Sequence, residues 1–117
     1  MNTYQDQDYI YLVDFLFSFE FPNKELIKEQ MHFATVRKEQ SEYHTVFYFE
    51  VSKECKCLPV ECNGMPVFIQ VKNPESLTCC ELFVRNGKLQ EYRIYNIDNS
   101  KLDIKKLHEG ATFLELK

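Results

Sequence analysis

The most constraining feature of the sequence is the segment CCELFVRNGKLQEYRIYN, residues 79–96, in which two strand-like runs flank an Asn-Gly pair. Asn-Gly suits the positive φ angles of a two-residue type I′ turn. A turn at Asn86-Gly87 would place Val84 opposite Leu89. The segment therefore predicts an antiparallel hairpin, which any fold of this chain must accommodate.

An unbroken register would pair Cys80 with Arg93, an apolar side chain against a charged one. A bulge near residues 90–91 removes this conflict, because one extra residue moves Tyr92 and Ile94 onto the core face. We therefore expect a bulged hairpin whose charged side chains lie mostly on the solvent side.

Further strands are predicted on both sides of this hairpin. FATVRK (33–38) and YHTVFYFEV (43–51) have period-two patterns around an EQSE turn, and ATFLELK (111–117) follows the short segment KKLHEG. In the second strand, alternation assigns one face to the core. That face carries Tyr43, Thr45, Phe47, Phe49 and Val51.

A second type I′ hairpin is predicted at Asn63-Gly64, between CLPVEC (57–62) and MPVFIQV (65–71). Pro59 and Pro66 cannot donate ladder hydrogen bonds, so their strands should lie at an edge or start late. A loop containing Asn73-Pro74 then leads to the 79–96 hairpin.

The N-terminal segment DYIYLVDFLFSFEF, residues 8–21, fits two patterns. Its Phe residues alternate at the end as in a strand, whereas the earlier part has helical spacing. We predict a helix over about residues 5–18, with an extended exit before Pro22. The core face of this helix is predicted from its apolar positions: Tyr9, Ile10, Leu12, Val13, Leu16 and Phe17. Asn23 is expected to cap a short second helix, KELIKEQM.

These elements predict a single α+β domain over residues 1–117, with two N-terminal helices packed on one face of a mainly antiparallel sheet of five to seven strands. A chain of 117 residues can bury one core, and its composition, 44% hydrophobic and 27% charged, is that of ordinary globular proteins.

The net charge of −4 is concentrated at the N-terminus. The first basic residue is Lys24, and the residues before it include four acids: Asp6, Asp8, Asp14 and Glu20. Phosphate contacts require clustered Lys and Arg, so nucleic acid is not an expected partner, whereas a basic protein is. No apolar run is long enough to span a membrane and the N-terminus lacks a basic signal region, so we expect a cytoplasmic protein without a membrane partner.

The five cysteines are expected to be reduced and unpaired, with at least Cys62 and Cys80 buried and inert. Their spacings do not match the paired ligands of zinc sites, and Cys79 and Cys80 should point to opposite faces of a strand. The three histidines lie far apart in sequence, and no phosphate-binding loop or catalytic motif is present. We therefore predict no catalytic residues, no metal site and no cofactor.

Three stretches resemble a family of small bacterial proteins of uncharacterised domain type: DFLFSFEFPNKELIKEQ, VECNGMPVFIQV and ELFVRNGKLQEYRIYNIDNSKLD. Such families are similar to the immunity proteins of polymorphic toxin and contact-dependent growth inhibition systems. Arg93 departs from the pattern, in which an acidic residue is expected. The resemblance implies a non-enzymatic protein that binds and neutralises a cognate toxin domain, and it brings no catalytic residues.

The predicted partner-binding surface lies on the outer face of the first helix and consists of Asp8, Tyr11, Asp14 and Phe15. Aromatic anchors among carboxylates suit a basic protein partner. The opposing interpretation is that another layer of the same domain covers these rings. Two other functions remain open: an adaptor or structural protein that forms a homodimer through a sheet edge, and a thiol-dependent enzyme or redox sensor built around Cys79 and Cys80. The immunity protein itself could be a monomer or such a dimer.

Overall fold

The computed structural model describes residues 6–73, 76–104, 107 and 112–116, with the backbone alone described for Asn73 and 112–116. The elements follow in this order: α1 (Gln7–Phe17), α2 (Lys24–His32), β1 (Ala34–Gln40), β2 (His44–Val51), the 3-10 helix η1 (Val60–Cys62), β3 (Gly64–Asn73), β4 (Ser76–Arg85), β5 (Lys88–Asn96) and β6 (Thr112–Leu116). The predicted Asn73-Pro74 loop and KKLHEG segment, and the ends of the predicted last strand, lie partly outside the described residues.

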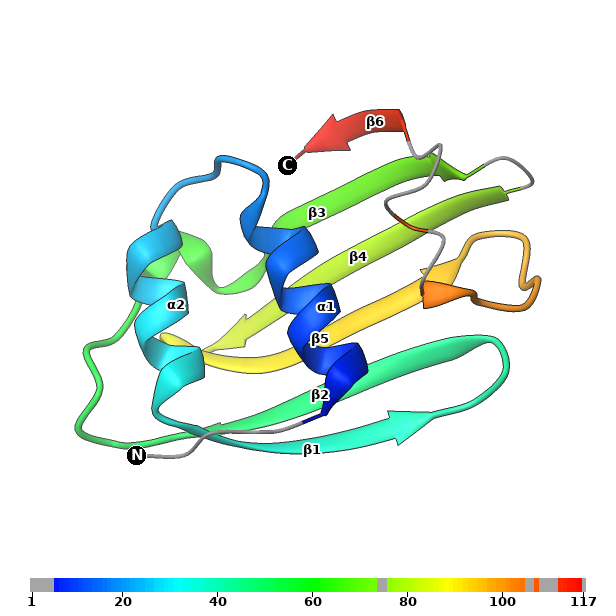
Figure 1. The fold of residues 1–117 in the computed structure, drawn as a ribbon. Coiled ribbons are helices and arrows are strands. Elements are labelled where there is room, and N and C mark those ends of the chain that lie inside the picture. The colour runs from blue at the N-terminus through cyan, green and yellow to red at the C-terminus, as the bar shows by residue number, and fades with distance from the viewer. Residues whose placement is uncertain (1–5, 74–75, 105–106, 108–111, 117) are drawn as a thin grey trace.

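The strands form one antiparallel sheet in the order β1-β2-β5-β4-β3-β6. Both helices lie on the same face of this sheet, with α1 running across its central strands (Figure 1). The predicted α+β class, with N-terminal helices on one face of an antiparallel sheet, is confirmed.

The β4–β5 hairpin forms as predicted. Asn86 and Gly87 have φ angles of 52° and 76°, and Val84 pairs with Leu89. The register then shifts so that Phe83 pairs with Glu91, which leaves Gln90 as the extra residue of a bulge. This shift places Tyr92 opposite Leu82 and Ile94 opposite Cys80, and all four side chains are fully buried.

The predicted second hairpin at Asn63-Gly64 is wrong. Asn63 is extended, with φ −62° and ψ 140°, and the segment before it forms a loop and η1 instead of a strand. The segment instead binds the β4–β5 turn: Leu58 N–H donates to the Gly87 carbonyl at 2.8 Å, and Gly87 N–H donates to Asn63 Oδ1 at 2.9 Å. Long-range hydrogen bonds to another turn therefore replace the expected local pairing.

The expected late start of strand pairing is confirmed at Pro66, whereas the strand predicted around Pro59 does not form. Pro66 lies in the register shift between Gly64 and Val67, so regular pairing of β3 with β4 begins only at Val67. Pro59 lies outside the strands, immediately before η1. A residue without an N–H is tolerated at both places because neither requires a ladder hydrogen bond.

Asp6 and Asn23 precede the two helices in different ways. Asp6 caps α1, accepting a hydrogen bond from Tyr9 N–H at 2.9 Å. Asn23 precedes α2 but has a left-handed φ of 62° and makes no side-chain cap bond, so the predicted cap is wrong. Its amide instead donates to Cys62 Sγ at 3.3 Å, which connects the start of α2 to η1.

The buried face of α1 is rotated from the predicted one. Tyr9, Leu12 and Leu16 are buried as expected, but Ile10 is 39% exposed and Phe15 is only 4% exposed. Phe15 follows Leu12 by three positions, and residues at that spacing share a helix face. Its ring also packs edge-on against Phe19, at 5.3 Å between centroids, where the chain turns after the helix.

The β2 core face is confirmed for Thr45, Phe47 and Phe49, which are buried. Tyr43 is 41% exposed because β2 begins only at His44. Over this face, Tyr9 packs edge-on against Phe47 at 4.9 Å, and Tyr92 Oη donates to the Leu12 carbonyl at 2.8 Å. These contacts hold α1 to the neighbouring strands β2 and β5.

One buried glutamine joins α2 to the β4–β5 turn. Gln30 Nε2 donates to the carbonyl oxygens of Lys56 and Gly87 at 2.8 and 2.9 Å. Its Oε1 accepts from Leu89 N–H at 2.9 Å. Because Gln30 is fully buried, these main-chain groups satisfy its amide in place of water.

Candidate protein-binding site

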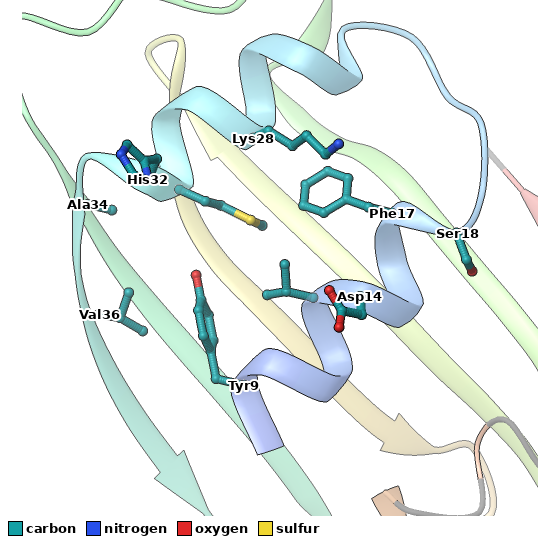
Figure 2. Close-up of a pocket in the computed structure, with 10 residues that line it drawn as sticks. Tyr9, Asp14, Phe17, Ser18, Lys28, His32, Ala34 and Val36 are labelled. Carbon is teal, nitrogen blue, oxygen red and sulfur yellow. The ribbon is translucent and has the colours of Figure 1, made fainter. Parts of the chain in front are cut away.

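A groove of about 610 Å³, here called the helix groove, lies between α1, α2 and β1 (Figure 2). Its lining is mainly apolar and includes Val13, Phe17, Met31, Ala34 and Val36. Tyr9, Asp14, Ser18, Lys28 and His32 complete the lining with polar or charged groups. An apolar recess with a few charged groups suits the anchoring of a side chain from another protein.

Charges of both signs lie around this groove. Asp14 comes from α1, while Lys28 and His32 come from α2. Lys28 Nζ lies 5.3 Å from the Phe17 ring centroid, and Figure 2 shows this ring between the two helices. Lys28 also lies 3.9 Å from Glu25, so its charge is shared between a ring and an exposed carboxylate.

The predicted partner-binding residues are only partly brought together. Asp8, Tyr11 and Asp14 line a smaller hollow of about 220 Å³ on the outer side of α1, together with Gln7, Ile10 and Ile104. Asp14 belongs to both this outer hollow and the helix groove. Phe15 lines neither, because it is buried in the core. The prediction that Phe15 faces outward is therefore wrong, and the alternative that the domain itself covers this ring holds for that residue.

The acidic N-terminal segment meets basic side chains that are distant in sequence. Lys38 of β1 reaches Asp6 at 3.2 Å and Asp8 at 3.1 Å, and Lys24 reaches Glu20 at 3.1 Å. Among the described residues, Asp14 makes no such ion pair. Within the described ranges, ion pairs therefore compensate the negative charges of Asp6, Asp8 and Glu20, but not that of Asp14.

The contacts of Lys38 with the carboxylates of α1 shift the pKa values of Asp6 and Lys38. Burial acts to raise the pKa of Asp6, but the hydrogen bonds from Tyr9 N–H and Lys38 outweigh it and leave the pKa below its ordinary value of 3.8. For Lys38, burial acts to lower the pKa, and the two carboxylates outweigh it and raise the pKa above 10.5. The charged forms of both groups are thus favoured by folding.

Replacing Lys38 with methionine should lower the free energy of unfolding at pH 7 by about 0.5–1 kcal/mol, the range of partly exposed ion pairs. The stability that the Asp6 carboxylate contributes is fully present above the pKa of Asp6 in the unfolded chain. It is lost as the pH falls through the lower pKa of Asp6 in the folded protein. The Lys38 contribution is lost only as pH rises through a folded pKa above 10.5. Denaturant unfolding should therefore show a smaller effect at pH 2 than at pH 7.

The matched control for this substitution is Lys53→Met, at an exposed lysine for which the structure shows no ion pair. It should change stability little at either pH. An equal loss for Lys38→Met at both pH values would mean that packing of its methylene chain, and not charge, stabilises this corner.

All five cysteines are free, and the predicted burial of Cys62 and Cys80 is confirmed. Burial raises the pKa of Cys80 to about 12, so its thiol stays protonated at neutral pH. Cys79 is also buried, on the opposite face of β4, and Gln70 Nε2 donates to its sulfur at 3.6 Å. Over the described part of the chain, no cluster of His, Cys, Asp or Glu has a metal-binding arrangement.

Comparison with protein-family models, curated proteins and solved structures finds no match to this chain. Neither described helix has the length and apolar content needed to cross a membrane.

Sequence reasoning missed Lys38, Lys28 and His32 as neighbours of the α1 surface. Of the contacts of this surface, only the cap by Asp6 could have been found from the sequence. An Asp three residues before Tyr9, at the start of a predicted helix, is a typical helix cap. Lys28, His32 and Lys38 approach α1 only because α2 and β1 pack beside it, and no spacing in the sequence predicts this packing.

Proposed function

We propose that this chain is an immunity-type protein, a non-enzymatic cytoplasmic binder that occupies a cognate toxin domain and blocks it. The observation that carries the proposal is the placement of Asp14 between the helix groove and the outer hollow. A carboxylate that makes no ion pair with the described residues, beside apolar recesses, suits a partner with a basic residue next to an apolar one. The resemblance of the sequence to small bacterial immunity proteins supports the same function.

The geometry also indicates how the partner would be held. An apolar side chain would enter the helix groove over Val13 and Phe17, while a lysine or arginine beside it would pair with Asp14. Tyr11, partly buried at the edge of the outer hollow, offers a further ring for contact. Such a contact acts by covering the partner, so it needs no catalytic group.

Two structural features weigh against the alternatives. A homodimer through β1 would require this edge strand to pair with a copy of itself, yet its second half carries Arg37, Lys38 and Glu39, and charged side chains discourage edge pairing. A thiol-dependent enzyme built on the vicinal cysteines would require an accessible thiolate, whereas Cys79 and Cys80 are both buried.

The test is binding to the toxin domain encoded next to this gene. Asp14→Lys should weaken binding at least about tenfold and reduce its dependence on salt, because the charge complementarity is reversed. Tyr11→Ala should also weaken binding. Glu50→Lys makes the same charge change on the opposite side of the domain, at an exposed position of β2, and should bind as the wild type does.

Wild-type affinity and salt dependence in both Asp14→Lys and Tyr11→Ala would exclude this surface as the binding site. The absence of a neighbouring toxin that the protein neutralises would remove the immunity function itself. Phe15→Ala is unsuitable as a binding variant, because truncating this buried ring should destabilise the fold by about 3–5 kcal/mol.

A further inference from the structure

A second pocket lies on the sheet face opposite the helices. This sheet pocket, of about 350 Å³, is lined by Tyr43, His44, Val46, Tyr48, Glu81, Arg93, Tyr95 and Asn99. Strand pairing builds it, because Val46 of β2 lies opposite Arg93 of β5, which lies opposite Glu81 of β4. Residues separated by long stretches of sequence thus meet on one row across three strands.

The distinctive group in this pocket is the carboxylate of Glu81. Glu81 is only 9% exposed, and it is the one charged residue among the buried residues that the structure describes. Tyr95 Oη donates to its Oε2 at 2.8 Å. Burial, followed by this hydrogen bond, raises the pKa of Tyr95, so the phenol remains a neutral donor.

The nearby Arg93 is directed to other partners. Its Nη2 lies 2.8 Å from Glu91 Oε2, and its guanidinium lies 5.5 Å from the Phe83 ring centroid. No ion pair involving Glu81 is present in the described part of the chain. With Arg93 Nη2 paired to Glu91, the buried Glu81 carboxylate in the sheet pocket has no cationic partner within ion-pair distance among the described residues.

Three tyrosines line the same pocket as this carboxylate: Tyr43, Tyr48 and Tyr95. Electron-rich ring faces attract cations, and this attraction strengthens when water is excluded. The Tyr48 ring already shows this chemistry within the domain, because the Arg37 guanidinium lies 4.3 Å from its centroid. A buried carboxylate in a pocket lined by tyrosines is therefore complementary to a compact cation on a long aliphatic stem.

We propose that the sheet pocket binds a lysine or arginine side chain presented by a protein partner. The charged end pairs with Glu81, and the stem lies against Val46 and the tyrosine rings. At about 350 Å³, the pocket has room for one long side chain. The pocket lies across the sheet from the helix groove, so it is a second contact whose test is independent of the proposed toxin binding.

The experiment uses two small probes and isotope-labelled protein. N-acetyl-lysine methylamide should produce saturable NMR shifts of the backbone amides around His44, Tyr95 and Asn99. N-acetyl-norleucine methylamide has a similar apolar stem without the charge and should produce none at the same concentration. Glu81→Gln should weaken binding of the lysine probe at least about tenfold. Glu50→Gln, the same change at an exposed position on this sheet face, should leave binding unchanged.

Tyr48→Leu provides a second variant, because Glu81→Gln removes the acceptor of the Tyr95 hydroxyl and could disturb the fold. Tyr48 is half-buried, and its replacement should weaken lysine binding about threefold or more by removing one ring wall. Equal binding of the two probes would overturn the proposal. So would unchanged lysine binding in a folded Glu81→Gln or Tyr48→Leu variant, or shifts confined to residues outside the pocket.

Discussion

Replacing Gln30 with leucine should lower the free energy of unfolding by about 3 kcal/mol, a large part of the stability of a small domain. Leucine has a similar volume but leaves Leu89 N–H and the Lys56 carbonyl oxygen without this partner, while the Gly87 carbonyl oxygen keeps only its hydrogen bond from Leu58 N–H. Unpaired buried polar groups cost about 1–3 kcal/mol each, and partial access of water to Lys56 reduces the total. Chemical denaturation of the two proteins measures the difference.

Gln7→Leu is the matched control, because it makes the same change at an exposed helical glutamine. It should alter stability by less than about 0.5 kcal/mol. Amide hydrogen exchange gives a second measure, since Leu89 N–H should exchange faster in the Gln30 variant. If Gln30→Leu unfolds like the wild type with Leu89 still protected, the amide bridge between α2 and the turn does not stabilise the domain.

Replacing Gly87 with alanine should lower the free energy of unfolding by about 3 kcal/mol. Two effects combine at this position. Its φ of 76° disfavours any L side chain, and an added Cβ would lie 2.7 Å from Cys57 Cβ and 3.2 Å from the Leu58 carbonyl oxygen. Because these neighbours include main chain and the first side-chain carbon, the loop itself must move. Thermal and denaturant unfolding should both show the loss.

Gly64 separates the two effects. It also has a positive φ, 101°, but an added Cβ there would meet no atom within 4 Å. Gly64→Ala should therefore cost only the backbone strain, about 1 kcal/mol. Equal losses at Gly64 and Gly87 would show that backbone strain alone matters and that the loop around Cys57 yields readily.

The hairpin at residues 79–96 was predictable down to its bulge because both signals are local. Asn86-Gly87 specifies the turn, and the clash of Cys80 with Arg93 in the simple register requires one extra residue. The same reasoning failed at Asn63-Gly64, where an identical dipeptide is extended at Asn63. There, hydrogen bonds to Gly87 from across the fold outweigh the local turn preference, and a sequence pattern does not contain that competition.

The candidate site was less predictable than the fold. Asp8, Tyr11 and Asp14 do line one hollow, since helical spacing alone brings them together. Phe15 was assigned to the wrong side, because the first helix has apolar residues around much of its circumference and packing decides which of them are covered. Glu81 and Tyr95, on separate strands, meet only through the register of β4 and β5. The sequence showed them as ordinary strand residues.

The sheet order described above also has a consequence for how the chain folds. β1–β2 and β3–β4–β5 pair neighbours along the chain, so each can form with short loop closures. The β2–β5 contact joins them and must wait for distant segments to meet, which is the slow kind of pairing. Helix α1 lies over this junction, with Tyr9 on Phe47 and Leu12 bonded to Tyr92. We infer that docking of the first helix and closure of the sheet form one cooperative folding step, in which neither half of the sheet is stable alone.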